Sequence, residues 1–352
     1  MKKLKKSTIN NIISFGIVII AFIICQSMIS TGAMKRSLKG QMVPICVYIV
    51  MAVSLNLVVG ISGELSLGHA GFMSVGAFSG IIASAWLNGA LHVENEVLRL
   101  VLAMIVGGAF AGLAGVLIGI PVLRLRGDYL AIVTLAFGEI IRNVLNCLYF
   151  SLDGGRLHVS FNNPNIPGTL LVSGPQGATG VDKIATFPVG FGLILFTLLV
   201  VLNLVNSRSG RAIMATRDNR IAAEAMGINV TKYKMMAFVT AAVLAGMAGA
   251  LYGMNFSTVA ASKFKFDTSI LVLVFVVLGG IGNIWGSIIA AALLTVLPEL
   301  LRAFADYRML VYAIVLILVM LVTNNPMLRS LMDGVFRRKG ASAQTQGGGA
   351  DE

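Results

Sequence analysis

The side chains that could do chemistry in this sequence are a few ionisable groups set within long apolar runs. Glu139 and Arg142 lie three residues apart in AFGEIIRNVLN, and Glu64 and His69 lie five apart in GELSLGHAGF. Burying an unpaired charge in hydrocarbon costs on the order of 2.5 to 3.5 kcal/mol, so such groups need a partner or water. Glu139 and Arg142 can neutralise each other on one helical face. Their role is either an internal ion pair or a polar wall that contacts a zwitterionic solute.

The patterns of common catalytic and metal sites are missing from the sequence. It contains no G-x-x-x-x-G-K-[ST] phosphate loop and no G-x-S-x-G, H-E-x-x-H or C-x-x-C motif. The three histidines are far apart, and the three cysteines all fall in apolar segments. We therefore expect no metal site, no cofactor bound by this chain and no enzymatic activity.

The composition indicates an integral membrane protein. Of 352 residues, 57% are hydrophobic and only 12% are charged, with a mean hydropathy of +0.88. A soluble chain could not bury so much apolar surface. Because one helical crossing takes about 20 residues, the chain has room for about ten transmembrane helices. The predicted fold class is all-α, a polytopic membrane helical bundle. Although the net charge is +12, we expect the bilayer and no nucleic acid as its surroundings.

The loops suggest three regions and an orientation. Residues 1–40 would hold a cytoplasmic tail, a first span at about 12–29 and an external turn. Residues 41–325 would form the transmembrane domain, and 326–352 a disordered cytoplasmic tail. In this topology 16 Lys and Arg lie inside and 10 outside, the bias expected with both termini in the cytoplasm. The Gly, Asn and Pro-rich segment 151–186 would then be external, either a flexible linker or a receiver for a substrate-delivering protein.

A Gly-rich polar segment interrupts the apolar sequence after the second span, which is expected at about Gln41 to Ile61. Irregular backbone at membrane depth is tolerated only where protein or a water-filled cavity covers it, so this segment is expected to line the interior. His69 could be a polar contact or a hydrogen-bonded structural histidine. The candidate residues of the substrate path are Glu64, Ser66, Gly68, His69, Thr134, Glu139 and Arg142.

The basic stretch from Ser207 to Lys234 lies between two apolar segments and is expected on the cytoplasmic side. Asp218 or Asn219 can cap a short helix there, and Gly227 can end it in the left-handed conformation. The exposed positions of this helix are predicted to be Ala222, Ala223 and Ala225, with Glu224 as the one acid and Met226 beside it. Small side chains would let another protein approach the backbone closely, and Glu224 could pair with an arginine of that partner. The alternative is an ordinary interfacial helix.

Two similar strings, AGLAGVLIG at 111–119 and AGMAGALYG at 245–253, agree at six of nine positions. Both present small residues at helical spacing, which is typical of close packing between membrane helices. The predicted topology runs the two helices in opposite directions. We therefore attribute the similarity to shared Gly and Ala content rather than to duplication.

Several of these stretches resemble the permeases of ATP-driven importers for branched-chain amino acids, in particular the LivM-like members. GELSLGHAGF resembles the family string GQxSLGHAxF, with Glu64 where the family has Gln. RGDYLAIVTLAFGEIIR, LGGIGNIWG and the GRA…RDN.IAAEAMGIN pattern are also similar to family sequences. SGPQGATG, within the external segment, resembles a family loop more weakly. The resemblance covers roughly residues 40–325.

The resemblance implies a permease of the ABC importer type in the inner membrane of a bacterium. It implies a second homologous permease subunit, two ATP-binding subunits that hold ATP and Mg, and an external amino-acid-binding protein. The segment 207–234 would be the coupling loop, with Arg211, Asp218, Ala222, Ala223, Glu224, Ala225 and Gly227 as its ATPase-coupling residues. The Gly-rich stretches 63–80 and 279–282 are candidate flexible points.

Two other functions stay open on the sequence. Related permeases carry urea, sugars and other small solutes, and no residue pattern here defines a pocket. An ion-coupled secondary transporter would need intramembrane carboxylates as ion sites, and Glu139 is the one central candidate.

Overall fold

The computed structural model describes residues 36–301 except 126, 154, 164 and 165, together with 22–29 and scattered positions at 16, 18, 31 and between 307 and 317. The predicted first span lies mostly outside the described residues. So do most of the tenth span and the tail 326–352. The chain divides into two units at residue 296, and the description below concerns the first of them.

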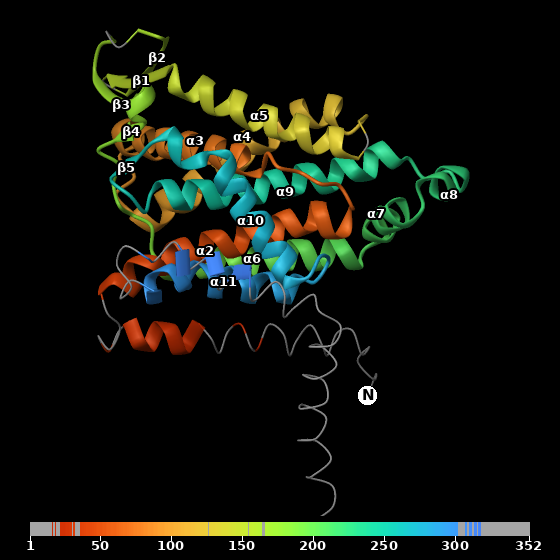
Figure 1. The fold of residues 1–352 in the computed structure, drawn as a ribbon. Coiled ribbons are helices and arrows are strands. Elements are labelled where there is room, and N and C mark those ends of the chain that lie inside the picture. The colour runs from red at the N-terminus through yellow and green to blue at the C-terminus, as the bar shows by residue number, and fades with distance from the viewer. Residues whose placement is uncertain are drawn as a thin grey trace, which may run out of the picture. The chain divides into compact units, whose positions relative to one another are not determined.

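Helices make up most of this unit, and the bounds of the long ones follow the apolar runs of the sequence (Figure 1). They are α2 (Arg36–Asn56), α3 (His69–Leu91), α4 (Glu96–Val122), α5 (Asp128–Asn146), α6 (Phe187–Asn206), α7 (Arg208–Asp218), α8 (Arg220–Ala225), α9 (Val230–Gly253), α10 (Phe266–Gly279) and α11 (Ile284–Leu300). A single π-helical turn, η1 (Leu57–Ile61), continues α2, and the short 3-10 turns η2 (Gly174–Gln176) and η3 (Ala261–Phe264) lie in loops.

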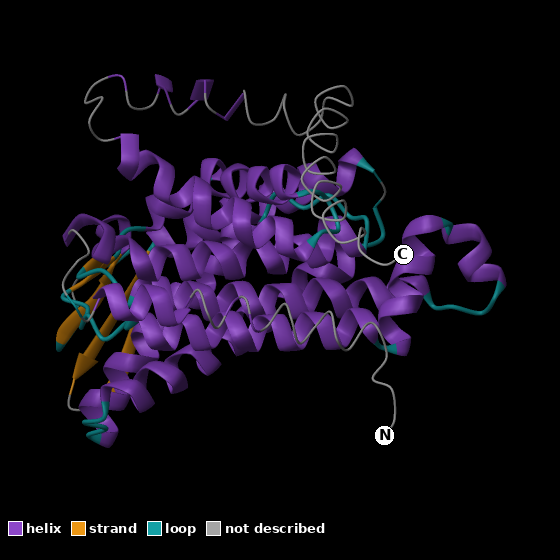
Figure 2. Cartoon of the chain, turned by 90° about the horizontal axis from the view of Figure 1, so that it is seen from below, coloured by secondary structure: helices purple, strands orange, loops and turns teal. Residues whose placement is uncertain are grey.

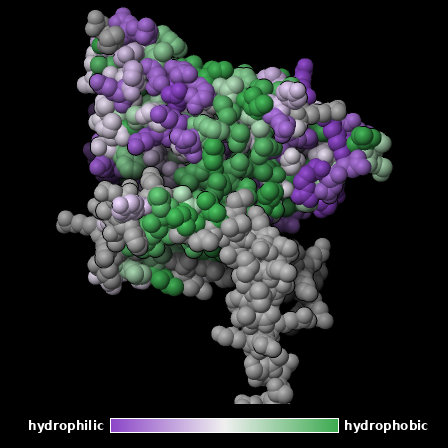
Figure 3. Space-filling view, in the orientation of Figure 1, coloured by the Kyte–Doolittle hydropathy of each residue, from purple (hydrophilic) through white to green (hydrophobic). Residues whose placement is uncertain are grey.

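Among the described residues, five helical segments are long and apolar enough to cross a membrane. They are Ser37–Ile61, His69–Leu91, Glu96–Val122, Phe187–Asn206 and Val230–Gly253, while α10 and α11 are apolar but shorter. Figure 3 shows a hydrophobic band over the helices, with hydrophilic residues gathered toward both ends of the band. The chain is therefore a multi-pass, mostly helical membrane protein.

Glycines set the packing of the central helices α3, α4 and α9. A Cβ built on Gly76 of α3 would lie 2.1 Å from the carbonyl oxygen of Gly246 in α9, and one built on Gly246 would lie 2.3 Å from the Cβ of Ala111 in α4. Further along, Gly115 of α4 lies against Ala242 of α9. Residue numbers therefore increase along α4 in the direction in which they decrease along α9. The two helices that carry the similar strings thus run antiparallel, as predicted, and pack through small residues.

A small sheet departs from the all-α prediction. Its strands are β1 (Leu148–Asp153), β2 (Arg156–Phe161), β3 (Thr169–Ser173), β4 (Ala178–Thr179) and β5 (Thr258–Val259), all antiparallel in the order β2-β1-β3-β4-β5. The local reason is visible in the sequence, since LYFSLD and RLHVSF are rich in aromatic and branched residues and flank the Gly-Gly hairpin signal at 154–155. Segment 151–186 is thus largely structured by β-sheet pairing rather than a featureless linker.

The sheet and the pair α7–α8 lie at opposite ends of the helices (Figures 1 and 2). This arrangement agrees with the prediction that segments 151–186 and 207–234 face opposite sides of the membrane. The polar segments are therefore sorted to the two ends, and the apolar helices lie between them.

Candidate functional site: the 207–234 segment and the Gly-rich segment beneath it

The short helix α8 begins and ends as its sequence predicts. Asn219, not Asp218, caps it, because the Asn219 side chain accepts a hydrogen bond of 3.0 Å from the Ala222 N–H. Asp218 instead pairs with Arg217 at 2.9 Å. Gly227 ends the helix with φ +79°, and the Ile228 N–H bonds back to the Ala223 carbonyl. A side chain other than glycine would be strained at this position.

The exposed surface of α8 differs from the predicted alanine face. Ala223 is only 4% exposed, whereas Ala222 and Ala225 are exposed. The large apolar side chains Ile221 and Met226 are 80% and 82% exposed. α8 therefore presents an apolar tip, made of Ile221, Ala222, Ala225 and Met226 and called here the α8 tip.

Glu224 is paired within α8 itself. Its carboxylate accepts a hydrogen bond of 2.8 Å from Arg220 Nε, one helical turn earlier. Arg211, on the preceding helix α7, donates to the Asn206 carbonyl at 3.4 Å and is otherwise exposed. Both charges thus contact only neighbours in sequence, which leaves the apolar side chains as the most prominent feature of the tip.

A cavity of about 340 Å³ lies between the 207–234 segment and the Gly-rich segment. Side chains of both charge signs and two leucines form its walls. The lining residues are Ser62, Gly63, Glu64, Leu65, Leu125, Gly127, Asp128, Thr216, Arg217, Arg220 and Lys234.

Glu64 lies in this cavity wall, and not with the other predicted path residues. It forms an ion pair with Lys234 of α9, and both side chains are only 12% exposed. The acid that replaces the expected Gln is therefore neutralised by a lysine of the 207–234 segment. A paired Glu64 fixes α9 to the Gly-rich segment, and its role in the substrate path stays a prediction.

Arg217 makes a second contact between the same two segments. Its Nη1 donates a hydrogen bond of 2.8 Å to the Gly60 carbonyl, inside the π-helical turn η1. A π-helical turn within an α-helix is uncommon and is frequent at functional sites. The last residue but one of α7 is thus bonded directly to an irregular turn of a membrane helix.

The other side of η1 contacts the turn between α10 and α11. The fully buried Asn56 accepts a hydrogen bond from the Gly282 N–H at 2.9 Å and donates one to Ser287 Oγ at 3.0 Å. Gly60 and Gly282 touch so closely that a Cβ on Gly60 would lie 2.3 Å from the Gly282 nitrogen. The predicted flexible stretch 279–282 therefore meets η1, which directly precedes the other predicted stretch, 63–80.

The remaining predicted path residues lie around the start of α3. His69 is 2% exposed and its Nε2 lies 2.8 Å from Ser54 Oγ, which confirms the hydrogen-bonded structural role. Thr134 accepts a bond of 3.0 Å from the Leu67 N–H, and a Cβ on Gly68 would meet the Thr134 carbonyl at 2.2 Å. Ser66 is buried, and its hydroxyl has no hydrogen-bond partner among the described residues. Gly68 and Thr134 thus bring the start of α3 against α5, and His69 bonds α3 to α2.

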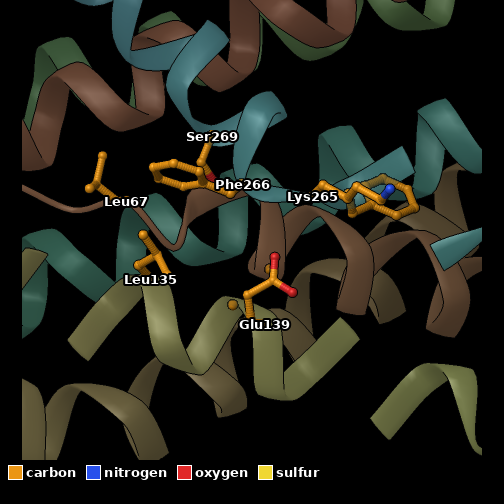
Figure 4. A pocket seen from close by; sticks show the side chains of 9 residues that line it. Leu67, Leu135, Glu139, Lys265, Phe266 and Ser269 are labelled. Atoms are coloured by element: carbon orange, nitrogen blue, oxygen red, sulfur yellow. The ribbon is translucent and has the colours of Figure 1, made fainter. Parts of the chain in front are cut away.

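Glu139 and Arg142 form the internal ion pair that their spacing allows, at 2.6 Å between Arg142 Nη2 and the carboxylate. Glu139 also borders a narrow space, about 10 Å³, between α5 and the start of α10. Figure 4 shows its carboxylate pointing from α5 toward Phe266 and Ser269. That space holds about one water molecule, so it is a polar seam in this conformation and not a solute site.

Sequence reasoning missed four residues of this site: Asn56, Arg217, Ile221 and Lys234. Asn56 had a readable signal, since an amide within an apolar span needs buried partners. The two basic residues carried no such signal, because the groups they bind lie more than 150 positions away in sequence. Among the described residues no group of three His, Cys, Asp or Glu could hold a metal ion.

Comparison with known proteins supplies the family. The family described as "Branched-chain amino acid transport system / permease component" matches residues 38–320. The high-affinity branched-chain amino acid transport system permease protein LivM of Salmonella typhimurium and that of Escherichia coli are each 34% identical over 309 residues, which is 78% of this chain and 66% of the relative.

More distant relatives include the LivH permease protein of the same system in Salmonella typhimurium, 26% identical over 286 residues, 78% of this chain and 89% of the relative. The ribose import permease protein RbsC of Escherichia coli is 28% identical over 287 residues, 78% of this chain and 81% of the relative. No solved structure gave a significant match. The chain thus aligns with just under two thirds of the length of the LivM proteins.

Proposed function

This chain belongs to the family of branched-chain amino acid transport permeases, and on that premise we propose that it is one permease subunit of an ATP-driven importer. Its solutes would be leucine, isoleucine and valine, carried across the cytoplasmic membrane through about ten helices. Both termini and α8 would lie in the cytoplasm, and the sheet outside. The relatives' printed names and the family match support the solute class.

The observation that carries the ATP-driven mechanism is the α8 tip. Ile221 and Met226 are large apolar side chains left more than three-quarters exposed on a short, well-capped helix at one end of the bundle. Exposed apolar groups that gather on a protruding element are typical of a protein interface. Because the sequence holds no phosphate loop, nucleotide hydrolysis would take place on partner subunits, which would hold the ATP and Mg.

Three partners complete the proposal. The family contains both LivM and LivH proteins of one named system, which supports a second, homologous permease beside this chain. Two ATP-binding subunits would receive the α8 tips. An external amino-acid-binding protein would deliver the solute at the sheet end, which is the structured surface opposite α8.

A sugar is the second candidate solute, because the ribose permease RbsC aligns over most of its own length. The LivM proteins are more similar, at 34% against 28% identity. An ion-coupled transporter is less well supported, since Glu139 is already neutralised by Arg142.

Substitution of Met226 by Asp tests the coupling surface. We expect loss of association with the ATPase subunits and loss of ATP-dependent leucine uptake in proteoliposomes, because a carboxylate at the α8 tip would have to be desolvated at the interface. Association is measured by co-purification and uptake with labelled leucine.

The conservative variant Met226→Leu is the matched control, and it should retain both properties. A Met226→Asp variant that still associates and transports would contradict the assignment of the α8 tip. Uptake by this chain alone, driven by a proton or sodium gradient, would contradict the ATP-driven mechanism itself.

A further inference from the structure

Two contacts join the 207–234 segment to the Gly-rich segment, and they lie on either side of α8 in sequence. Arg217, just before α8, donates to the Gly60 carbonyl. Lys234, in the first turns of α9, forms the ion pair with Glu64. α8 is therefore anchored at its entrance and at its exit to the same short stretch of residues 60–64.

These contacts are the kind that transmit a displacement. A guanidinium group is a rigid, permanently charged donor, and its bond to Gly60 fixes the end of α7 to a backbone carbonyl. The Glu64–Lys234 pair is about nine-tenths buried, so separating the two charges leaves each without compensation. The ion pair thus resists separation more strongly than an exposed surface pair does.

The element they hold is itself suited to change shape. η1 is a single π-helical turn that ends α2, and Gly63 just beyond it has φ +75°. The adjoining cavity of about 340 Å³ gives the side chains on the α8 side of η1 room to move. On its other side, Asn56 bonds to Gly282 and Ser287 at the α10–α11 turn.

We propose that Arg217 and the Glu64–Lys234 pair are positioning residues that carry movement of α8 to η1, and that Asn56 passes it on to the Gly280–Gly282 turn. The inference rests on the proposed function, since it deepens the coupling mechanism of an ATP-driven permease. It places the moving element at η1, which Arg217 reaches at Gly60 and which the ion pair reaches through Glu64, whose N–H donates to the Val58 carbonyl.

Charge exchange at the ion pair tests the first link. The variants Glu64→Lys and Lys234→Glu are compared with the double exchange in the complete complex, reconstituted with its ATPase and permease partners. Three quantities are measured: assembly, ATP hydrolysis and leucine uptake. Each single exchange should leave assembly intact and lower uptake per ATP hydrolysed by about tenfold, and the double exchange should restore most of it, as a coupled pair requires.

Removal of the guanidinium tests the second link. Arg217→Gln should lower uptake per ATP hydrolysed by about tenfold, within the range of coupling free energies between sites. Arg208→Gln is the matched control, because Arg208 lies at the start of the same helix α7 and its side chain is exposed. This control should keep the ratio of uptake to hydrolysis.

The outcomes separate this inference from the proposed function. ATP-dependent uptake whose ratio to hydrolysis is unchanged in Arg217→Gln and in both single exchanges would overturn the two links alone. A double exchange that is no better than the single exchanges would overturn the ion pair as a link. Wild-type uptake that needs no ATPase subunits would overturn the proposed function and this inference with it.

Discussion

At the scale of single residues, several polar groups inside this bundle have polar side-chain or backbone partners. His69 meets Ser54, Asn56 meets Gly282 and Ser287, and Glu139 meets Arg142. An unmatched polar group in a membrane interior has neither water nor protein to bond with. Removal of one partner should therefore lower the stability of the protein, even at a position where no solute binds.

Substitution of Ser54 by Ala tests this at His69. The ring would lose its bond to Ser54 while remaining 2% exposed. We expect a loss of about 0.5 to 2 kcal/mol in stability, the range for side-chain bonds between membrane helices. Thermal unfolding in detergent measures it. Ser79→Ala is the control, because Ser79 bonds only to carbonyls of its own helix, and a loss as large as that of Ser54→Ala would refute the argument.

Interactions between residues close in sequence could be predicted better than interactions between distant residues. The Asn219 cap, the Gly227 stop and the Glu139–Arg142 pair are local features, separated by at most four positions, and spacing alone indicates them. The partner of Glu64 could not be predicted, because Lys234 is 170 residues away. Exposure of Ile221 likewise depends on how α8 turns against α9, which spacing does not determine.

At the scale of elements, α4 and α9 approach closely because their glycines have no side chain that would hold the two backbones apart. A Cβ on Gly246 would come within 2.7 Å of the Gly107 carbonyl as well as 2.3 Å from the Ala111 Cβ. Backbone atoms cannot move aside as a flexible side chain can, so the helices themselves would have to separate.

The variant Gly246→Val should therefore destabilise the bundle by about 1 to 3 kcal/mol through overpacking. The readout is the melting temperature of the purified protein in detergent. Gly192→Ala on α6 is the matched control, since a Cβ there meets nothing within 4 Å, and it should be neutral or slightly stabilising. Equal melting temperatures for the two variants would contradict the close contact.

The sheet contains strands that the sequence pattern does not predict. The helices follow from apolar runs of the right length, so all the described long helices were expected. Strands β4 and β5 have only two residues each and pair across about 80 positions. No periodicity can be read from two residues, and their pairing is a consequence of where α6 and α9 bring the chain.

At the scale of the whole molecule, the proposed orientation makes a labelling prediction. With the native cysteines replaced, Ile221→Cys in α8 should react with a membrane-impermeant maleimide only when the cytoplasmic side is open. Val159→Cys in β2 should react from the outside, because both side chains are exposed at opposite ends of the helices. Labelling of both positions from the same side would refute the orientation.

The sheet also constrains how the helices can move. Backbone bonds join the segment before α6 to the segment after α9, from Val181 to Ser257 and from Ala185 to Met254, beside the β4–β5 pair. The start of α6 and the end of α9 are thus joined by main-chain hydrogen bonds, which a rearrangement of side chains does not break. A force applied to α9 at its α8 end would therefore tilt this helix about the sheet, rather than move it along its own axis.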